Sequence, residues 1–221
     1  MKSIAAALLL LSTVFARPVQ SPVPVEKEPR HHFKFENKYV RVFDVVVPPG
    51  DTTLFHTHSN DYTFVSIGSA DLKAEAMGSP AGDMKLKDGE VRFTKATITH
   101  RVTNVAPSTF RNITIEVLST PGTAPKQSEP LPLHTLVLEN DKIRVERLIL
   151  EPGKTAPVHT HTQPGLAVAV SAGKVVFESA GQKPQTVEFK PGEYRWRDAA
   201  VTHSVKNVGK TRFEVVDFEW K

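Results

Sequence analysis

The sequence predicts an all-β fold built from two tandem units, and two observations support this prediction. Segments rich in Val, Ile, Thr and aromatic residues recur along the chain, and Gly, Pro or Asn interrupts them about every eight to twelve residues. The second half also repeats the first at a fixed offset of 103 residues without a gap. Short strands at even spacing favour a sandwich or a barrel over alternating strands and helices.

The repeat depends on identical residues at equivalent positions of the two halves. A chance match over this length is implausible, so we interpret the chain as an internal tandem duplication. The clearest matches are Glu36-Asn37 with Glu139-Asn140, Pro49-Gly50 with Pro152-Gly153, His56 and His58 with His159 and His161, Thr99-His100 with Thr202-His203, and Asn104-Val105 with Asn207-Val208.

The first residues resemble a secretory signal peptide. Residues 1–16 begin with the basic Lys2, continue with an apolar stretch over 4–11, and end with small residues before Arg17. The apolar stretch is too short to span a bilayer. We therefore expect an exported protein, secreted or periplasmic.

Two Pro-rich polar segments divide the rest of the chain. Residues 17–30 are expected to form an extended leader with nothing to bury, and residues 119–133 are expected to form a linker. The predicted domains are therefore 31–118 and 134–221.

Composition and charge exclude several classes of function. Lys and Arg number 28 against 24 Asp and Glu, and no basic cluster is concentrated enough for a nucleic-acid partner. No membrane association is expected after signal cleavage. Cysteine is absent, which removes disulfides and thiolate ligands. No P-loop, G-x-G-x-x-G or G-x-S-x-G motif is present.

The histidines carry the strongest chemical signal. In a strand, residues i and i+2 point to the same face, so an H-x-H pair aims two imidazoles into one space. A third histidine follows 42 residues after the pair in each copy. Two adjacent imidazoles and one from a distant strand are a common metal site. The predicted ligands are His56, His58, His100, His159, His161 and His203.

Three further histidines belong to neither triplet. His31, His32 and His134 lie beside the Pro-rich segments, and we expect them to be solvated surface residues.

These motifs resemble the cupin superfamily, in a two-domain or bicupin arrangement. The residues that fit the two cupin motifs are Gly50, His56, His58, Gly89, His100 and Asn104 in the first copy, and Gly153, His159, His161, Gly173, Gly192, His203 and Asn207 in the second. The resemblance covers both repeats and implies two tandem cupin-type jelly-roll β-barrels. It also implies a small-molecule ligand or substrate, and association through strand edges into a homo-oligomer.

The sequence departs from the cupin pattern at the glutamate that normally supplies a fourth ligand. Tyr62 or Thr63 stands there in the first copy, and Gly165 or Leu166 in the second. Three neutral imidazoles leave the charge of a divalent metal uncompensated and suit iron, zinc, copper or nickel. Such an open site favours anionic or chelating ligands.

The segments after the two H-x-H pairs differ. "SNDYTF" in the first copy offers polar groups, whereas "TQPGLAV" in the second predicts a nearly apolar wall. The first copy is therefore expected to carry the polar ligand chemistry. Tyr62 in the first copy and Gln163 in the second are candidate polar neighbours of the metal.

Three functions remain open at this stage. The resemblance to cupins with three-histidine iron sites implies a metal-dependent dioxygenase or a related small-molecule oxidoreductase. A non-catalytic protein that binds a metal or small ligand is the second interpretation. A storage-like bicupin with vestigial histidines is the third.

Overall fold

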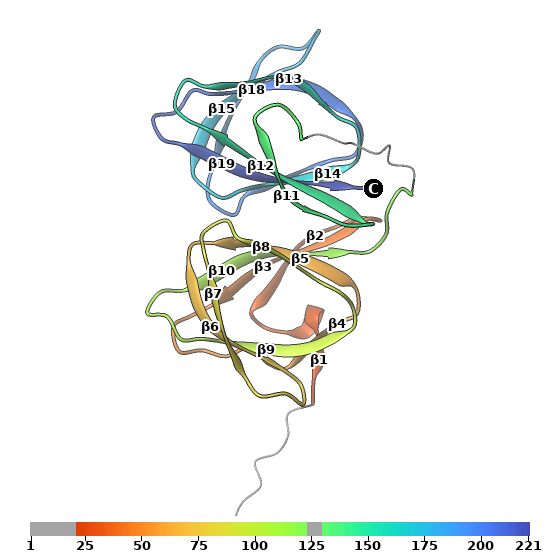
Figure 1. Ribbon diagram of the computed structural model, residues 1–221, viewed down its shortest axis with the longest axis vertical. Helices are drawn as coiled ribbons and strands as arrows, with labels where there is room; N and C mark the ends of the chain where they lie inside the picture. The colour runs from red at the N-terminus through yellow and green to blue at the C-terminus, as the bar shows by residue number, and fades with distance from the viewer. Residues whose placement is uncertain (1–20, 123–129) are drawn as a thin grey trace, which may run out of the picture.

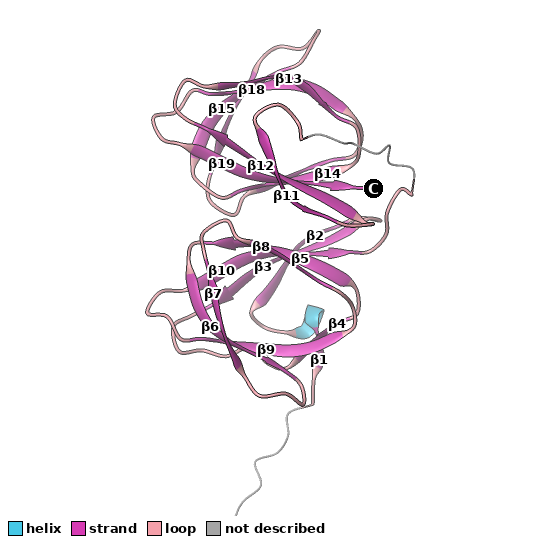
Figure 2. Ribbon diagram, viewed as in Figure 1, coloured by secondary structure: helices cyan, strands magenta, loops and turns pink. Residues whose placement is uncertain are grey.

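The computed structural model describes residues 21–122 and 130–221. The predicted signal peptide therefore lies outside the described residues, as does the middle of the predicted linker at 119–133. The described chain consists almost entirely of strands and connecting loops, with one short 3-10 helix (Figure 2). No helix within these two ranges is long and apolar enough to cross a membrane. The all-β prediction is confirmed.

The first unit is a sandwich of two five-stranded sheets. Its outer sheet has the order β1-β4-β9-β6-β7, with β1 at Val23–Pro24, β4 at His56–His58, β9 at Ile98–Asn104, β6 at Ala70–Ala76 and β7 at Gly82–Leu86. Its inner sheet has the order β2-β3-β10-β5-β8, with β2 at His31–Glu36, β3 at Val40–Val47, β10 at Phe110–Val117, β5 at Asp61–Ile67 and β8 at Val91–Thr94. Consecutive strands alternate between the sheets at several points, as in a jelly roll.

Within the described residues the second unit repeats this topology strand for strand, without a counterpart of β1, whose equivalent positions 126 and 127 lie outside the described ranges. Its outer sheet has the order β13-β18-β15-β16, with β13 at Thr155–His161, β18 at Val201–Asn207, β15 at Gly173–Glu178 and β16 at Gln185–Phe189. Its inner sheet has the order β11-β12-β19-β14-β17, with β11 at His134–Glu139, β12 at Ile143–Leu150, β19 at Phe213–Trp220, β14 at Gly165–Ala169 and β17 at Tyr194–Arg197.

The two units are stacked with their inner sheets facing each other (Figure 1). A single apolar cluster fills the space between these sheets, and it includes Val42, Ile115, Val145, Leu166, Phe218 and Trp220. Separate clusters fill the interior of each sandwich. The central strands β10 and β19 of the inner sheets are therefore buried on both faces, and all eight residues of "FEVVDFEW" are buried, its three acidic residues included.

A repeated asparagine shows how the shared motif residues build the same turn twice. Asn104 donates its two amide hydrogens to the carbonyls of Val47 and Ser108, at 2.9 and 2.8 Å. Asn207 makes the equivalent bonds in the second unit, both at 2.8 Å. Both side chains are fully buried. Replacement of either asparagine would therefore leave buried backbone carbonyls without a hydrogen-bond donor, which destabilises the fold.

The expectation that residues 17–30 have nothing to bury is wrong for the described part of this segment. Val23 and Pro24 pair in parallel with β4, and the 3-10 helix η1 (Val25–Lys27) follows directly. Val25 is 1% exposed and belongs to the core of the first unit, and Glu28 is 2% exposed. The segment is buried because apolar valines stand between its prolines, although its overall composition is Pro-rich and polar.

Candidate metal centre

The H-x-H pair of the first unit lies on β4, with both side chains buried inside the sandwich. His100 lies directly opposite His56 on the antiparallel strand β9. Between ring centroids, His56 is 5.2 Å from His58 and 4.5 Å from His100, and His58 is 5.4 Å from His100. The strand register therefore brings the three predicted ligands of the first copy together.

The second unit has the same arrangement. His159 lies opposite His203 across the β13–β18 pair. The ring centroids of His159 and His161 are 5.0 Å apart. The ring centroid of His203 lies 4.8 Å from that of His159 and 5.2 Å from that of His161. The six histidines thus form two clusters, one in each sandwich.

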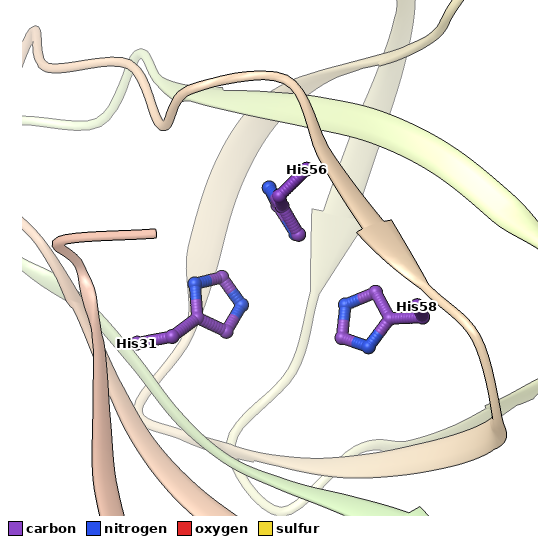
Figure 3. Close-up of side chains that lie close together, drawn as sticks. All are labelled: His31, His56 and His58. Atoms are coloured by element: carbon purple, nitrogen blue, oxygen red, sulfur yellow. The ribbon is translucent and has the colours of Figure 1, made fainter. Parts of the chain in front are cut away.

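A fourth histidine, from outside the two motifs, joins each cluster. The ring of His31 lies 4.5 Å from that of His56 and 5.9 Å from that of His58, and the three rings face a common space (Figure 3). One ring nitrogen from each of these three lies within 4.8 Å of the others. His31 is 8% exposed, so its expected place on the surface is wrong.

His134 is the equivalent residue of the second cluster. Its ring lies 5.1 Å from that of His159 and 6.1 Å from that of His161. It is half-buried rather than fully solvated. The available signal was the repeat itself, because His31 and His134 also lie 103 positions apart. His32, the next residue along β2, is exposed as expected.

Backbone carbonyls fix the protonation of several rings. His56 donates from Nδ1 to the carbonyl of Leu54 at 2.9 Å, and His159 donates to that of Pro157 at 2.7 Å. His134 makes the same bond, at 2.9 Å, to the carbonyl two positions before it. A carbonyl only accepts, so the proton sits on Nδ1 and Nε2 keeps its lone pair. That lone pair is the one that a metal requires.

A glutamate at the same position in each repeat orients the second histidine of the H-x-H pair. The Nδ1 of His58 lies 3.3 Å from Glu116 Oε1, and that of His161 lies 3.0 Å from Glu219 Oε1. Both glutamates come from the inner sheet and are buried. A carboxylate behind a metal-binding imidazole fixes the ring and raises its basicity. Burial raises the pKa of Glu116, and Arg41 opposes this rise.

Five of the rings are uncharged at neutral pH. Burial, together with neighbouring imidazoles, lowers the pKa of His56 and His58 to about 3 and that of His100 to about 2. Burial likewise lowers the pKa of His159 to about 4 and that of His203 to about 3. Neutral imidazoles are the form that coordinates a cation.

Three of the inward ring nitrogens have nothing to bind within the described chain. The Nε2 atoms of His56, His100 and His159 are buried without a hydrogen-bond partner. A buried polar atom left unpaired is costly, and one metal ion in each unit would satisfy the unpaired nitrogens of that unit. The residues present therefore fit a divalent ion with nitrogen preference, such as iron, zinc, copper or nickel.

Each cluster borders a cavity. The first cavity has a volume of about 240 Å³ and its apolar lining includes Phe64, Phe93, Ile98 and Phe110. The second has a volume of about 250 Å³ and its apolar lining includes Leu148, Phe177, Phe189 and Phe213. Both spaces are large enough for a small organic molecule beside the imidazoles.

The second cavity is not the nearly apolar site that its sequence after the H-x-H pair suggests. Arg197 forms a two-pronged ion pair with Asp217, at 2.6 and 2.7 Å, and also donates to Glu219 at 3.2 Å. Burial alone would raise the pKa of Asp217, but Arg197 and His161 hold it below its usual range. These polar groups lie on β17 and β19, far in sequence from the segment "TQPGLAV" that predicts an apolar wall.

The two candidate polar neighbours have different outcomes. The ring of Tyr62 stacks on that of His58, with centroids 4.0 Å apart and an angle of 19° between the planes. Burial raises the pKa of its hydroxyl, so the group is neutral. Gln163 lies in the turn between β13 and β14, partly exposed, and is not among the residues that line the second cavity.

Comparison with solved structures settles the fold. AerE from Microcystis aeruginosa superposes with a TM-score of 0.63 over 88% of this chain and 98% of its own, at 11% identity. A cupin 2 conserved barrel domain protein from Leptotrichia buccalis gives a TM-score of 0.54 over 86% of this chain and 87% of its own, at 14% identity. The chain has the cupin fold.

A third cupin-fold neighbour is an enzyme by its description. A salicylate 1,2-dioxygenase from Pseudaminobacter salicylatoxidans gives a TM-score of 0.59 over 89% of this chain and 77% of its own, at 13% identity. No family model matches the sequence, and no curated protein matches it. Identities this low speak for the fold alone.

Proposed function

We propose that this cupin binds a divalent metal in each unit and uses at least one of the two sites for oxidoreductase chemistry on a small molecule. The observation that carries the metal assignment is the convergence of neutral, buried imidazoles with unpaired Nε2 atoms in both units. The proposed ligands common to both units are His56, His58 and His100, and His159, His161 and His203.

A small-molecule substrate is supported by the cavity beside each cluster. The metal would act as a Lewis acid or redox centre for a ligand bound next to it. Apolar side chains would surround the body of the substrate and exclude water. Lys183 and Arg195 also line the second cavity, and cations at this position favour a substrate with an anionic group. Dioxygenase activity of a cupin-fold neighbour is in keeping with this proposal.

Oxygen uptake by the metal-loaded protein tests the catalytic half of the proposal. The protein is loaded with Fe²⁺, Cu²⁺ or Ni²⁺ and offered a panel of small chelating acids, while an oxygen electrode records consumption. We expect uptake with at least one pair of metal and acid, and its loss in the His159→Ala/His161→Ala or the His56→Ala/His58→Ala variant. Metal binding without uptake across the panel would favour a non-catalytic binding protein. Less than stoichiometric metal would favour a storage-like protein.

Export is a separate part of the proposal. The segment "MKSIAAALLLLSTVFA" supports a cleaved signal peptide and a secreted or periplasmic location. N-terminal sequencing of the protein recovered outside the cytoplasm should start at or near Arg17. Recovery of the intact N-terminus only from the cytoplasm would contradict export.

A further inference from the structure

The fourth histidine of the first cluster comes from the opposite sheet of the sandwich. His56, His58 and His100 lie on β4 and β9 of the outer sheet, whereas His31 lies on β2 of the inner sheet. Its ring reaches across the interior and lies 4.5 Å from that of His56. Figure 3 shows one of its ring nitrogens turned toward the space between His56 and His58.

A buried carboxylate holds His31 in this position. Glu28 Oε2 accepts a hydrogen bond from His31 Nδ1 at 2.7 Å, and the same carboxylate accepts from the backbone amides of Arg30 and Leu54, at 2.7 and 3.1 Å. The Glu28 side chain is 1% exposed. Leu54 precedes the H-x-H strand by two residues, so one carboxylate joins the N-terminal segment to the loop directly before His56. With Nδ1 engaged, only Nε2 of His31 is free for a metal.

We propose that His31 is a fourth metal ligand of the first site and that Glu28 positions it, so that docking of the N-terminal segment and metal binding support each other. The proposal rests on metal binding at the three-histidine sites. His134 occupies the equivalent position of the second site, but a backbone carbonyl of Pro132 holds its ring. Leu131 stands where the first copy has Glu28, so the carboxylate support belongs to the first site alone.

This geometry has a mechanical consequence. A metal bound to His31 and to the histidines of β4 and β9 would cross-link the two sheets of the first sandwich. Binding to the folded state alone stabilises that state by mass action. The bound metal should therefore stabilise the first unit against unfolding, and removal of His31 should break the link between sheets while three ligands remain.

The test uses the full chain with the second site silenced by His159→Ala/His161→Ala, so that only the first site binds. Zn²⁺ affinity is measured by competition with a chelator, and the visible absorption of bound Co²⁺ reports the number of ligands. We expect His31→Ala to weaken Zn²⁺ binding by about 100-fold and to change the Co²⁺ spectrum. Glu28→Gln, which keeps the shape but loses the charge, should weaken binding by about 10-fold.

Matched controls separate ligation from general damage. His32→Ala removes the exposed neighbour on the same strand, and Lys27→Gln removes an exposed charge from the same N-terminal segment; both should leave affinity and spectrum unchanged. Wild-type affinity and spectrum in a folded His31→Ala protein would overturn the proposal. If His31→Ala does not fold, Glu28→Gln decides, and unchanged affinity there overturns it. Failure of the parent to bind Zn²⁺ or Co²⁺ at all would instead refute the proposed metal function.

Discussion

The two histidine clusters share one framework and differ in the groups that support it. In both, an H-x-H pair and a third histidine face each other across antiparallel strands, and a fourth ring comes from the opposite sheet. The supporting carboxylates are distributed differently. In the first cluster they hold two different rings, Glu28 on His31 and Glu116 on His58.

In the second cluster both carboxylates lie against one ring. Glu219 lies 3.0 Å and Asp217 3.7 Å from His161, and Arg197 bridges the two acids. The comparison teaches that duplicated strands fix where the imidazoles lie, whereas residues on other strands decide how each is held. The positions that form the bridge in the second unit, Arg197 and Asp217, are Thr94 and Thr114 in the first.

The largest expected difference between the units concerns Arg197. Replacement by Met leaves Asp217 and Glu219 buried without their cation, which should lower the free energy of unfolding by about 3–5 kcal/mol. Denaturant unfolding measures the loss. The matched variant Thr94→Ala removes no charge and should lower it by about 1 kcal/mol or less. Equal losses for the two variants would contradict the role given to the bridge.

A smaller loss of stability is expected for a substitution at Gly165, the position in the second unit that corresponds to Tyr62 in the first. A Cβ at Gly165 would lie 2.2 Å from Arg197 Nη2 and 2.5 Å from the carbonyl oxygen of Phe218. Gly165→Ala should therefore destabilise the protein by about 1–3 kcal/mol. Gly82→Ala is the control, because a Cβ there meets nothing within 4 Å. If Gly165→Ala is as stable as Gly82→Ala, the close contacts of a Cβ at position 165 do not restrict this position.

The doubled fold could be predicted because both the 103-residue repeat and the alternation of strands and turns are visible in the sequence itself. The six histidines of the motifs could be placed together because the i, i+2 rule and strand pairing fix their direction. His31 could not be placed because proximity to prolines suggested solvent, whereas it lies inside the sandwich against Glu28, Phe43 and His56. The Arg197 bridge could not be predicted, since its partners on β19 are brought to it only by the register of the inner sheet.

Mild acid should lower the free energy of unfolding of the metal-free protein. Folding holds the pKa values of five histidines well below the 6.5 of an unfolded chain: His56, His58, His100, His159 and His203. Unfolding at a pH between the folded and unfolded values therefore takes up protons, and the free energy of unfolding falls as the pH drops below 6.5. From pH 6.5 to 5.5 the loss is about 1 kcal/mol for each proton taken up.

NMR titration of the ring protons should show which ring protonates first. We expect the midpoint of His159 near 4 and those of His56 and His203 near 3, so His159 is protonated at the highest pH of these three. Midpoints near 6.5 for all three rings would mean that the imidazoles are solvated rather than buried.

The smallest effect is expected from the hydroxyl of Tyr62. Its contribution to the first cluster is the stacked ring, so Tyr62→Phe should change Zn²⁺ affinity by no more than about twofold, while Tyr62→Ala should weaken it more because His58 loses its packing partner. Chelator competition measures both. A large loss in Tyr62→Phe would give the hydroxyl a direct part in the site.

Elemental analysis of protein purified without a histidine tag tests the central claim most directly. One divalent ion per histidine cluster is expected in the unmodified chain. His56→Ala/His58→Ala should remove the ion of the first cluster alone, and His159→Ala/His161→Ala that of the second alone. An unmodified, folded protein that takes up no stoichiometric metal after dialysis against iron, zinc, copper and nickel would contradict the account.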